Sequence, residues 1–326
     1  MIRLDGVTKV YETKQGPLTS VDHVSFEVPH GETCVLLGPS GCGKTTTLRM
    51  INRLVAPTSG KIFIDGHDTD RVDPVELRRT IGYVIQQIGL FPNMTVAENI
   101  AVVPRLLKWD TARIRRRAQD LLAMLALEPA DFLDRYPGEL SGGQAQRVGV
   151  ARALAADPPV LLMDEPFGAV DPVNREVIQD EFLRMQRELR KTVLFVSHDI
   201  DEAVKMADRI AIFRAGRLEQ YAPPDELLGR PANEFVKGFV GSDRTLKRLR
   251  RICVREVMSA AGARTRRDGA TVHAGDDLRR VATLFLELDT DELACVDEGG
   301  AVVGVVTREA VAARLAGADM AATTPQ

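Results

Sequence analysis

The sequence predicts an α/β fold over residues 1–240, followed by a small α+β domain over 253–318. Two observations support this division. Short apolar runs alternate with helical patterns in the first part, and Pro and Gly residues at 223–224 and 229–231 interrupt the chain where that part closes. Apolar runs separated by helices are typical of a sheet covered on both faces. A chain of 326 residues is long enough for roughly two domains.

The expected buried strands are short runs rich in Val, Ile, Leu and Phe. They lie at 35–37, 81–85, 160–163, 193–196 and 210–213. Between about 90 and 157 the pattern is mostly helical, and 113–127 is its clearest amphipathic stretch. We expect this part to be a helical subdomain inserted between two halves of the sheet.

The C-terminal part is expected to contain a strand, a helix, two strands and a helix, in that order. The corresponding runs are 271–272, 278–288, 293–296, 302–306 and 310–315. Residues 241–252 form a basic linker before this domain, and 319–326 are expected to be disordered.

Basic residues crowd the linker and the residues after it. They are Arg244, Lys247, Arg248, Arg250, Arg251 and Arg255, continued by Arg264, Arg266 and Arg267. Such a segment is attracted to an anionic membrane surface, and salt screens the attraction. A solvated connector between two domains explains the same residues, and both interpretations stay open.

The composition narrows the possible functions. The net charge of −3 lacks the basic excess of a nucleic-acid binder, so no nucleic-acid partner is expected. The N-terminus does not resemble a signal peptide, and no stretch is apolar enough to span a bilayer. The four cysteines lack metal-ligand spacing and are expected to be reduced thiols.

A phosphate-binding loop is the strongest motif. It reads Gly38, Pro39, Ser40, Gly41, Cys42, Gly43, Lys44, Thr45 and Thr46, after an expected strand and before a helical run at 45–54. The glycines allow backbone N–H groups to face phosphate oxygens at a helix N-terminus. Lys44 is expected to bridge the β- and γ-phosphates, and Thr45 to ligate Mg²⁺. The cofactors predicted are therefore ATP and Mg²⁺.

Two acidic residues end the strand at 160–163. Asp164 is expected to hold the magnesium shell, and Glu165 to polarise the attacking water as general base. Acidic residues often end strands, so this assignment depends on the phosphate loop.

A second anion site is expected at the start of a helix. Ser141, Gly142, Gly143 and Gln144 combine an N-cap serine with exposed backbone N–H groups. An ordinary helix cap explains Ser141 alone. Because one loop already encloses the nucleotide, we expect this second site to close over the γ-phosphate of another subunit.

Three further side chains are candidates. Gln86 could reach the magnesium or the attacking water, with Gln87 as its rival, and His198 could contact the γ-phosphate. Tyr11 on an early strand could stack on adenine, or simply pack in a sheet.

Together these motifs resemble the nucleotide-binding subunit of an ABC transporter, over residues 1 to about 240. The resemblance implies a P-loop NTPase fold and matches Tyr11 to the adenine-stacking loop, Gln86 to the Q-loop and 140–144 to the signature motif. Asp164 matches Walker B, Glu165 the catalytic glutamate, and His198 the switch histidine; 169–171 match the D-loop, with Val170 in place of the common Leu.

A narrower resemblance, at 50–54, 75–79, 81–92 and 106–109, is to the ATPases of importers for glycine betaine, choline or carnitine. Residues 253–316 resemble a single CBS motif, with Ala310 where ligand-binding copies often have an acid. The resemblance implies a homodimer working with membrane permease subunits, and indirectly with a solute-binding protein, at the cytoplasmic face of the plasma membrane. Another solute, or an ABC ATPase without a transporter, remain alternatives.

Overall fold

A computed structural model describes residues 1–86, 89–168, 170–260 and 270–320. The chain forms two compact units, Met1–Tyr221 and Ala222–Gln326. The sequence placed the end of its first domain at residue 240, whereas the compact units divide at Ala222. Helix α9 (Pro224–Gly229) packs against α11 (Arg244–Leu249), and this contact assigns α9 to the second unit.

The first unit is built on a six-stranded sheet in the order β10-β9-β3-β8-β7-β6. The strands are β3 (Thr33–Leu37), β6 (Ile81–Val84), β7 (Val160–Asp164), β8 (Thr192–Val196), β9 (Arg209–Arg214) and β10 (Arg217–Ala222). All five apolar runs expected as strands are confirmed. Neighbouring pairs from β9 to β6 are parallel, and every residue of β3, β7 and β8 is buried. Burial on both faces explains why these strands are apolar throughout.

Helix α1 (Lys44–Ile51) follows β3, while α7 (Pro172–Leu189) and α8 (Ile200–Met206) precede and follow β8. The helix expected at 45–54 ends at Ile51, earlier than predicted. Arg53 has a φ of +48° and donates hydrogen bonds to the carbonyls of Thr69 and Val72, so the backbone leaves the helix there.

A second sheet in the order β2-β1-β4-β5 completes the first unit. It consists of β1 (Ile2–Thr13), β2 (Gly16–Val28), β4 (Ser59–Ile64) and β5 (His67–Asp68), followed by η1 (Thr69–Arg71) and α2 (Pro74–Arg79). Leu4, Val24 and Ile62 from this sheet share one hydrophobic core with Leu48 and Met50 of α1. Packing between this sheet and α1 fixes the helix that begins at the phosphate loop.

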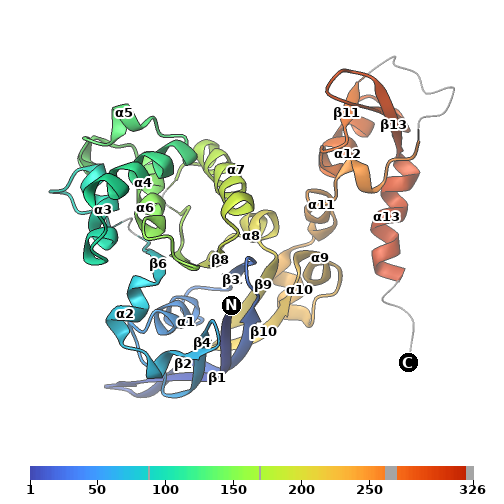
Figure 1. Cartoon of the computed structure of the whole chain (residues 1–326). Helices are drawn as coiled ribbons and strands as arrows, with labels where there is room; N and C mark the ends of the chain where they lie inside the picture. The colour runs from blue at the N-terminus through green and yellow to red at the C-terminus, as the bar shows by residue number, and fades with distance from the viewer. Residues whose placement is uncertain (87–88, 169, 261–269, 321–326) are drawn as a thin grey trace. The chain divides into compact units, whose positions relative to one another are not determined.

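The expected helical insertion is confirmed. It contains α3 (Val96–Leu106), α4 (Thr111–Met124), α5 (Pro129–Phe132), η2 (Pro137–Glu139) and α6 (Gly142–Leu154). Figure 1 shows α3, α4, α5 and α6 gathered in one region, and α6 packs against both α3 and α4. The amphipathic stretch expected at 113–127 is α4. Asp110 caps its start, and Ala126, with φ of +53°, follows its end.

The second unit adds α10 (Glu234–Val240), η3 (Val254–Glu256), β11 (Thr271–His273), α12 (Leu278–Glu287), β12 (Glu292–Val296), β13 (Val302–Thr307) and α13 (Arg308–Met320). The strand-helix-strand-strand-helix order is confirmed. The Pro pair at 223–224 was expected to interrupt the chain where the first domain closes. It instead begins helix α9, because proline is well suited to the first turn of a helix. Apolar residues from α12 and the three-stranded sheet form one core with Leu249 and Ile252.

The linker at 241–252 belongs to this unit and is only partly exposed. Its helix α11 buries Lys247, whose ammonium donates to the Val240 carbonyl at 3.0 Å and pairs with Asp243 at 3.0 Å. Arg248 is also buried. Arg264, Arg266, Arg267 and 321–326 lie outside the described residues. Throughout the described part of the chain, every helix is too short or too polar to cross a membrane.

Candidate functional site

A cavity of about 550 Å³ opens where the loops after β3, β6, β7 and β8 meet. Half of the residues predicted to bind ATP lie on its wall, together with Glu165 and His198. The lining comprises Ser20, Ser40, Gly41, Cys42, Gly43, Lys44, Thr45, Thr46, Gln86, Glu165 and His198. The carboxyl ends of parallel strands meet at one edge of a sheet. This explains why residues as far apart in the sequence as Ser40 and His198 line the same cavity.

The phosphate loop needs glycine at two positions. Gly38 has φ of +144° and Gly43 has φ of +104°, a range that side chains other than glycine rarely adopt. A Cβ on Gly38 would lie 2.3 Å from the Phe213 carbonyl oxygen, and one on Gly43 would lie 2.4 Å from that of Ser20. The loop is therefore packed tightly against β9 and β2, which fixes its shape before any ligand binds.

Lys44 is the first residue of helix α1, and its side chain stabilises the phosphate loop through hydrogen bonds. Its side chain is buried, and its ammonium donates to the carbonyls of Gly38 at 2.6 Å and Pro39 at 2.9 Å. The Cys42 thiol lies 3.7 Å from the same nitrogen, and burial raises the pKa of that thiol. An ammonium held at the mouth of a helix N-terminus suits an incoming phosphate.

Asp164 ends β7 and faces the start of α1. Its carboxylate accepts a hydrogen bond of 3.0 Å from the Thr45 hydroxyl and is only 3% exposed. Burial raises the pKa of Asp164, and the Thr45 hydrogen bond acts in the opposite direction. The structure thus brings together the hydroxyl and the carboxylate that the sequence assigned to magnesium.

Glu165 projects into the cavity from a backbone with φ of +49°, and its N–H donates to the Val196 carbonyl of β8 at 3.1 Å. The Gln86 amide donates to the Glu165 carboxylate at 2.9 Å. Nδ1 of His198 lies 3.8 Å from the same oxygen. The three side chains predicted to act in catalysis therefore meet at one carboxylate oxygen.

The second predicted anion site lies elsewhere on the unit. Ser141 is the N-cap of α6, as expected, and its hydroxyl accepts from the Gln144 N–H at 3.3 Å. The Gln144 side chain accepts in turn from the Ser141 N–H at 2.9 Å, completing a capping box. Ser141 and Gln144 are exposed or half-buried and do not line the cavity of their own chain.

Tyr11 is on β1, as expected, opposite Leu18 of β2. The Lys9 ammonium lies 5.0 Å above its ring, and Tyr11 does not line the cavity. Its role in stacking on adenine stays a prediction. Gln87, the rival of Gln86, and Ala169 of the predicted D-loop lie outside the described residues.

Two residues of the site were missed in the sequence. Ser20 of β2 lines the cavity, and its hydroxyl donates to the Thr46 hydroxyl at 3.0 Å. Arg152 of α6 donates to the Gly89 carbonyl at 2.6 Å and so links the helix that starts at Ser141 to the loop after Gln86. Neither belongs to a motif, so a single sequence offers no signal for them.

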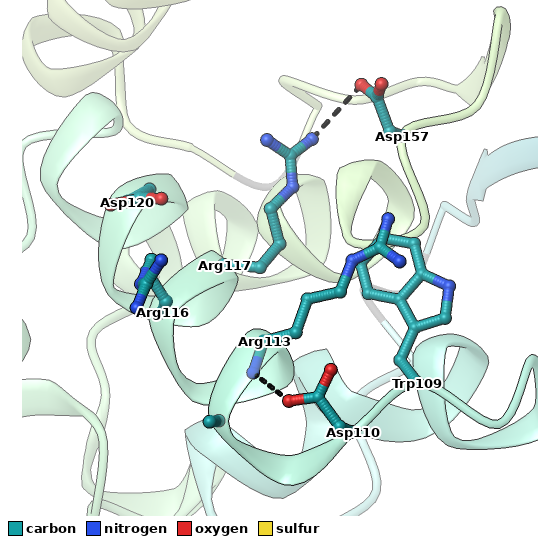
Figure 2. A pocket seen from close by; sticks show the side chains of 8 residues that line it. Trp109, Asp110, Arg113, Arg116, Arg117, Asp120 and Asp157 are labelled. Atoms are coloured by element: carbon teal, nitrogen blue, oxygen red, sulfur yellow. Dashed lines mark hydrogen bonds and ion pairs between the residues drawn. The ribbon is translucent and has the colours of Figure 1, made fainter.

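A separate hollow of about 400 Å³ lies along α4 and contains none of the predicted site residues. Figure 2 shows the Arg113 guanidinium against the Trp109 ring, 3.6 Å from its centre, and Arg117 reaching Asp157. Arg117 also donates to the Leu154 carbonyl at 3.1 Å. These contacts stabilise the end of α6, and we assign the hollow a structural role.

Comparison with known proteins identifies the relatives of this chain. A family model described as ABC transporter matches residues 21–168. The chain is 59% identical over 309 residues to the osmoprotectant import ATP-binding protein OsmV of Salmonella typhimurium, covering 94% of this chain and 79% of that protein. It is 49% identical over 312 residues to the glycine betaine/carnitine/choline transport ATP-binding protein OpuCA of Bacillus subtilis, covering 95% and 79%.

Solved structures resemble the first unit. The ATP-binding cassette MJ0796, in a dimeric post-hydrolysis state bound to ADP and Pi, matches with a TM-score of 0.62 at 37% identity. The match covers 68% of this chain and 98% of the other.

Proposed function

Because this chain belongs to the ATP-binding proteins of ABC transporters, we propose that it is the ATP-hydrolysing subunit of an importer for quaternary-amine osmoprotectants. The observation that carries this proposal is the identity of 59% with an osmoprotectant import protein over 94% of the chain. The likeness extends through the second unit, which a general relationship between ATP-binding cassettes does not require. Glycine betaine, carnitine and choline are the solutes named for such relatives.

The cavity supports a division of labour among its side chains. We assign Lys44 and the backbone of 38–46 to the phosphates, Glu165 to the attacking water as general base, and Gln86 and His198 to the same water and the γ-phosphate. The convergence of Gln86 and His198 on the Glu165 carboxylate supports these roles. Tyr11 is proposed to stack on adenine.

The residues around Asp164 fit a magnesium ion. Thr45 and Asp164 present hard oxygen donors 3.0 Å apart, and the Asp164 carboxylate is buried. Bound there, Mg²⁺ would neutralise phosphate charge during hydrolysis. Thr45, Asp164 and Gln86 would hold it.

We propose that two copies act together. Each chain carries one phosphate loop and one helix end at 141–144, and that helix end lies outside its own cavity. A head-to-tail pair would place Ser141, Gly142, Gly143 and Gln144 of one copy over the nucleotide held by Lys44 of the other. The dimeric state named for the related cassette supports this arrangement.

The remaining partners follow from the importer assignment. We propose that the pair docks on permease subunits at the cytoplasmic face of the membrane, as a peripheral protein, and receives solute indirectly from a binding protein. The alternatives are an importer of another solute and an ATPase without a permease.

The test is solute uptake by vesicles that contain the permease of the same importer, with ATP inside. Labelled glycine betaine, carnitine and choline are compared with alanine, which lacks the quaternary ammonium group. We expect ATP-dependent uptake of at least one quaternary amine, and none with Glu165→Gln in place of the native protein. Uptake of alanine alone would favour another solute, and failure to bind any permease would favour the ATPase without a transporter.

A further inference from the structure

Glu202 is a buried acid to which the proposed mechanism gives no role. It lies in the first turn of α8 and is only 7% exposed. Its carboxylate accepts a hydrogen bond of 3.0 Å from the Gln179 amide of α7. A buried carboxylate is costly unless it is paired or hydrogen-bonded, so the Gln179 amide helps to stabilise it there.

Asp199 connects the first turn of α8 to the turn that carries His198. Its carboxylate accepts from the Glu202 N–H at 3.3 Å, and its own N–H donates to the Ser197 hydroxyl at 3.0 Å. The Ser197 N–H donates to the Leu36 carbonyl of β3 at 3.1 Å. The residues before and after His198 are therefore hydrogen-bonded to each other and to the helix turn that contains Glu202.

His198 itself has few restraints of its own. Its side chain is 66% exposed, lines the cavity and lies 3.8 Å from Glu165. The position of its imidazole thus follows the backbone between Ser197 and Asp199. A shift of that turn would move the ring relative to Glu165.

Helix α7 provides the other end of the connection. Gln179 and Arg175 are four residues apart and share one face of the helix. Gln179 contacts Glu202, while Arg175 donates to the Val170 carbonyl at 2.9 Å in the segment matched to the D-loop. The Arg175 charge also acts on Glu202, lowering its pKa against the larger effect of burial, which raises it.

We propose that Glu202 is a positioning residue for hydrolysis, which fixes the first turn of α8, and with it the adjoining His198 turn, to α7 through Gln179. The loop at Val170, the helix α7 and the turn carrying His198 then move as one body. Glu202 does not touch the nucleotide and acts only through His198. This inference rests on the proposed role of His198 in hydrolysis.

A purely structural role for Glu202 predicts different behaviour. If the acid only stabilises the packing of α7 on α8, its loss lowers the melting temperature. Any loss of hydrolysis activity would then be independent of the loss caused by a change at His198, and the two losses would combine in a double variant. If it acts through His198, its loss has no further effect once the imidazole is gone.

The experiment is a double-mutant cycle on the full-length protein, read by single-turnover ATP hydrolysis. Gln179→Leu removes the hydrogen bond from α7 to the Glu202 carboxylate. We expect its rate constant to fall about 10-fold with the KM for ATP unchanged, and to show no further fall when combined with His198→Ala. The proposal would be overturned if the fold-loss of rate in the double variant equalled the product of the fold-losses in the two single variants. An unchanged rate in Gln179→Leu would also overturn it.

A swapped pair keeps the test independent of folding defects. Glu202→Gln with Gln179→Glu restores a hydrogen bond with donor and acceptor exchanged, and we expect it to recover activity lost in Gln179→Glu alone. Glu188→Gln, on the exposed part of α7, is the matched control and should hydrolyse ATP normally. A normal rate in His198→Ala would instead reject the assigned role of His198, while a slow His198→Ala with multiplying effects would reject only the role of Glu202.

Discussion

The Gln86 amide donates a hydrogen bond of 2.9 Å to the Glu165 carboxylate. Gln86 lies in the loop after β6, whereas Glu165 follows β7, so the hydrogen bond joins the exits of two neighbouring parallel strands. A general base must have a free lone pair directed at the attacking water. In the proposed role of Glu165 as general base, the Gln86 amide would occupy one of the lone pairs of its carboxylate.

The first prediction concerns that carboxylate. Glu165→Gln should leave ATP binding intact and slow hydrolysis by at least about 100-fold, since an amide cannot act as general base while the phosphate loop is unchanged. Steady-state phosphate release and nucleotide binding measure the two effects. The control is Glu188→Gln, and near-normal turnover of Glu165→Gln would remove the catalytic assignment.

The second prediction separates binding from chemistry. Lys44→Ala should raise the Kd for ATP roughly 10- to 100-fold, the effect of losing a charged hydrogen-bonding partner. Lys44 also holds the carbonyls of Gly38 and Pro39, so the melting temperature without nucleotide must be measured as well. Lys14→Ala, at an exposed position, is the control. Unchanged ATP affinity in a folded Lys44→Ala protein would contradict the assignment.

The site was largely predictable because its residues occur at the ends of strands that were visible as apolar runs. Lys44 follows β3, Glu165 follows β7 and His198 follows β8, and a parallel sheet brings such ends together. Ser20 and Arg152 could not be predicted, since their contacts join segments far apart in the sequence. The burial of Lys247 was missed for a related reason: a basic run predicts exposure, whereas α11 packs on α9.

The third prediction uses the buried carboxylate of Asp164. Burial raises its pKa in the folded protein, so ionisation of Asp164 opposes folding when no nucleotide is bound. This cost is absent below the ordinary pKa of 3.8, grows as pH rises through it, and is complete above the folded pKa. Asp164→Asn keeps an oxygen for the Thr45 hydroxyl and removes the charge.

We therefore expect Asp164→Asn to melt at a higher temperature than the native protein without nucleotide, by about 2–4 °C for each kcal/mol recovered. The difference should be larger at pH 8 than at pH 4, and Mg²⁺-dependent hydrolysis should be lost. Thermal unfolding at both pH values measures it, with Asp134→Asn, an exposed position, as control. A variant that is less stable than the native protein at pH 8 would show that the charge stabilises the fold.

The fourth prediction is ATP-dependent pairing. With hydrolysis blocked by Glu165→Gln, ATP and Mg²⁺ should convert the protein from monomer to dimer in light scattering. Ser141→Arg places a bulky side chain at the exposed cap of α6 and should prevent the dimer while leaving ATP binding unchanged. Glu128→Arg, at an exposed position before α5, is the control. A Glu165→Gln protein that stays monomeric with ATP bound would count against the head-to-tail arrangement.

The last prediction concerns the second unit. Deleting residues 243–326 should leave basal ATP hydrolysis within about two-fold, because every residue assigned to ATP binding or hydrolysis lies before residue 243. The deletion removes the hydrophobic cluster from Leu249 to Val311 as a whole, and every residue lining the ATP cavity lies before it. Hydrolysis rate and KM for ATP are the measurements. Loss of ATP affinity in the truncated protein would mean that the second unit supports the cavity.

Deletion also tests the membrane contact. Lys247 and Arg248 are buried and so unavailable to an anionic surface, whereas Arg255 is exposed. Each basic residue near such a surface contributes about 1 kcal/mol at most, and salt screens it. Uptake in anionic vesicles should therefore depend less on internal ionic strength in the truncated protein, with no difference in neutral vesicles. Coinciding curves in anionic vesicles would reject the membrane contact and leave α11 as a packing element alone.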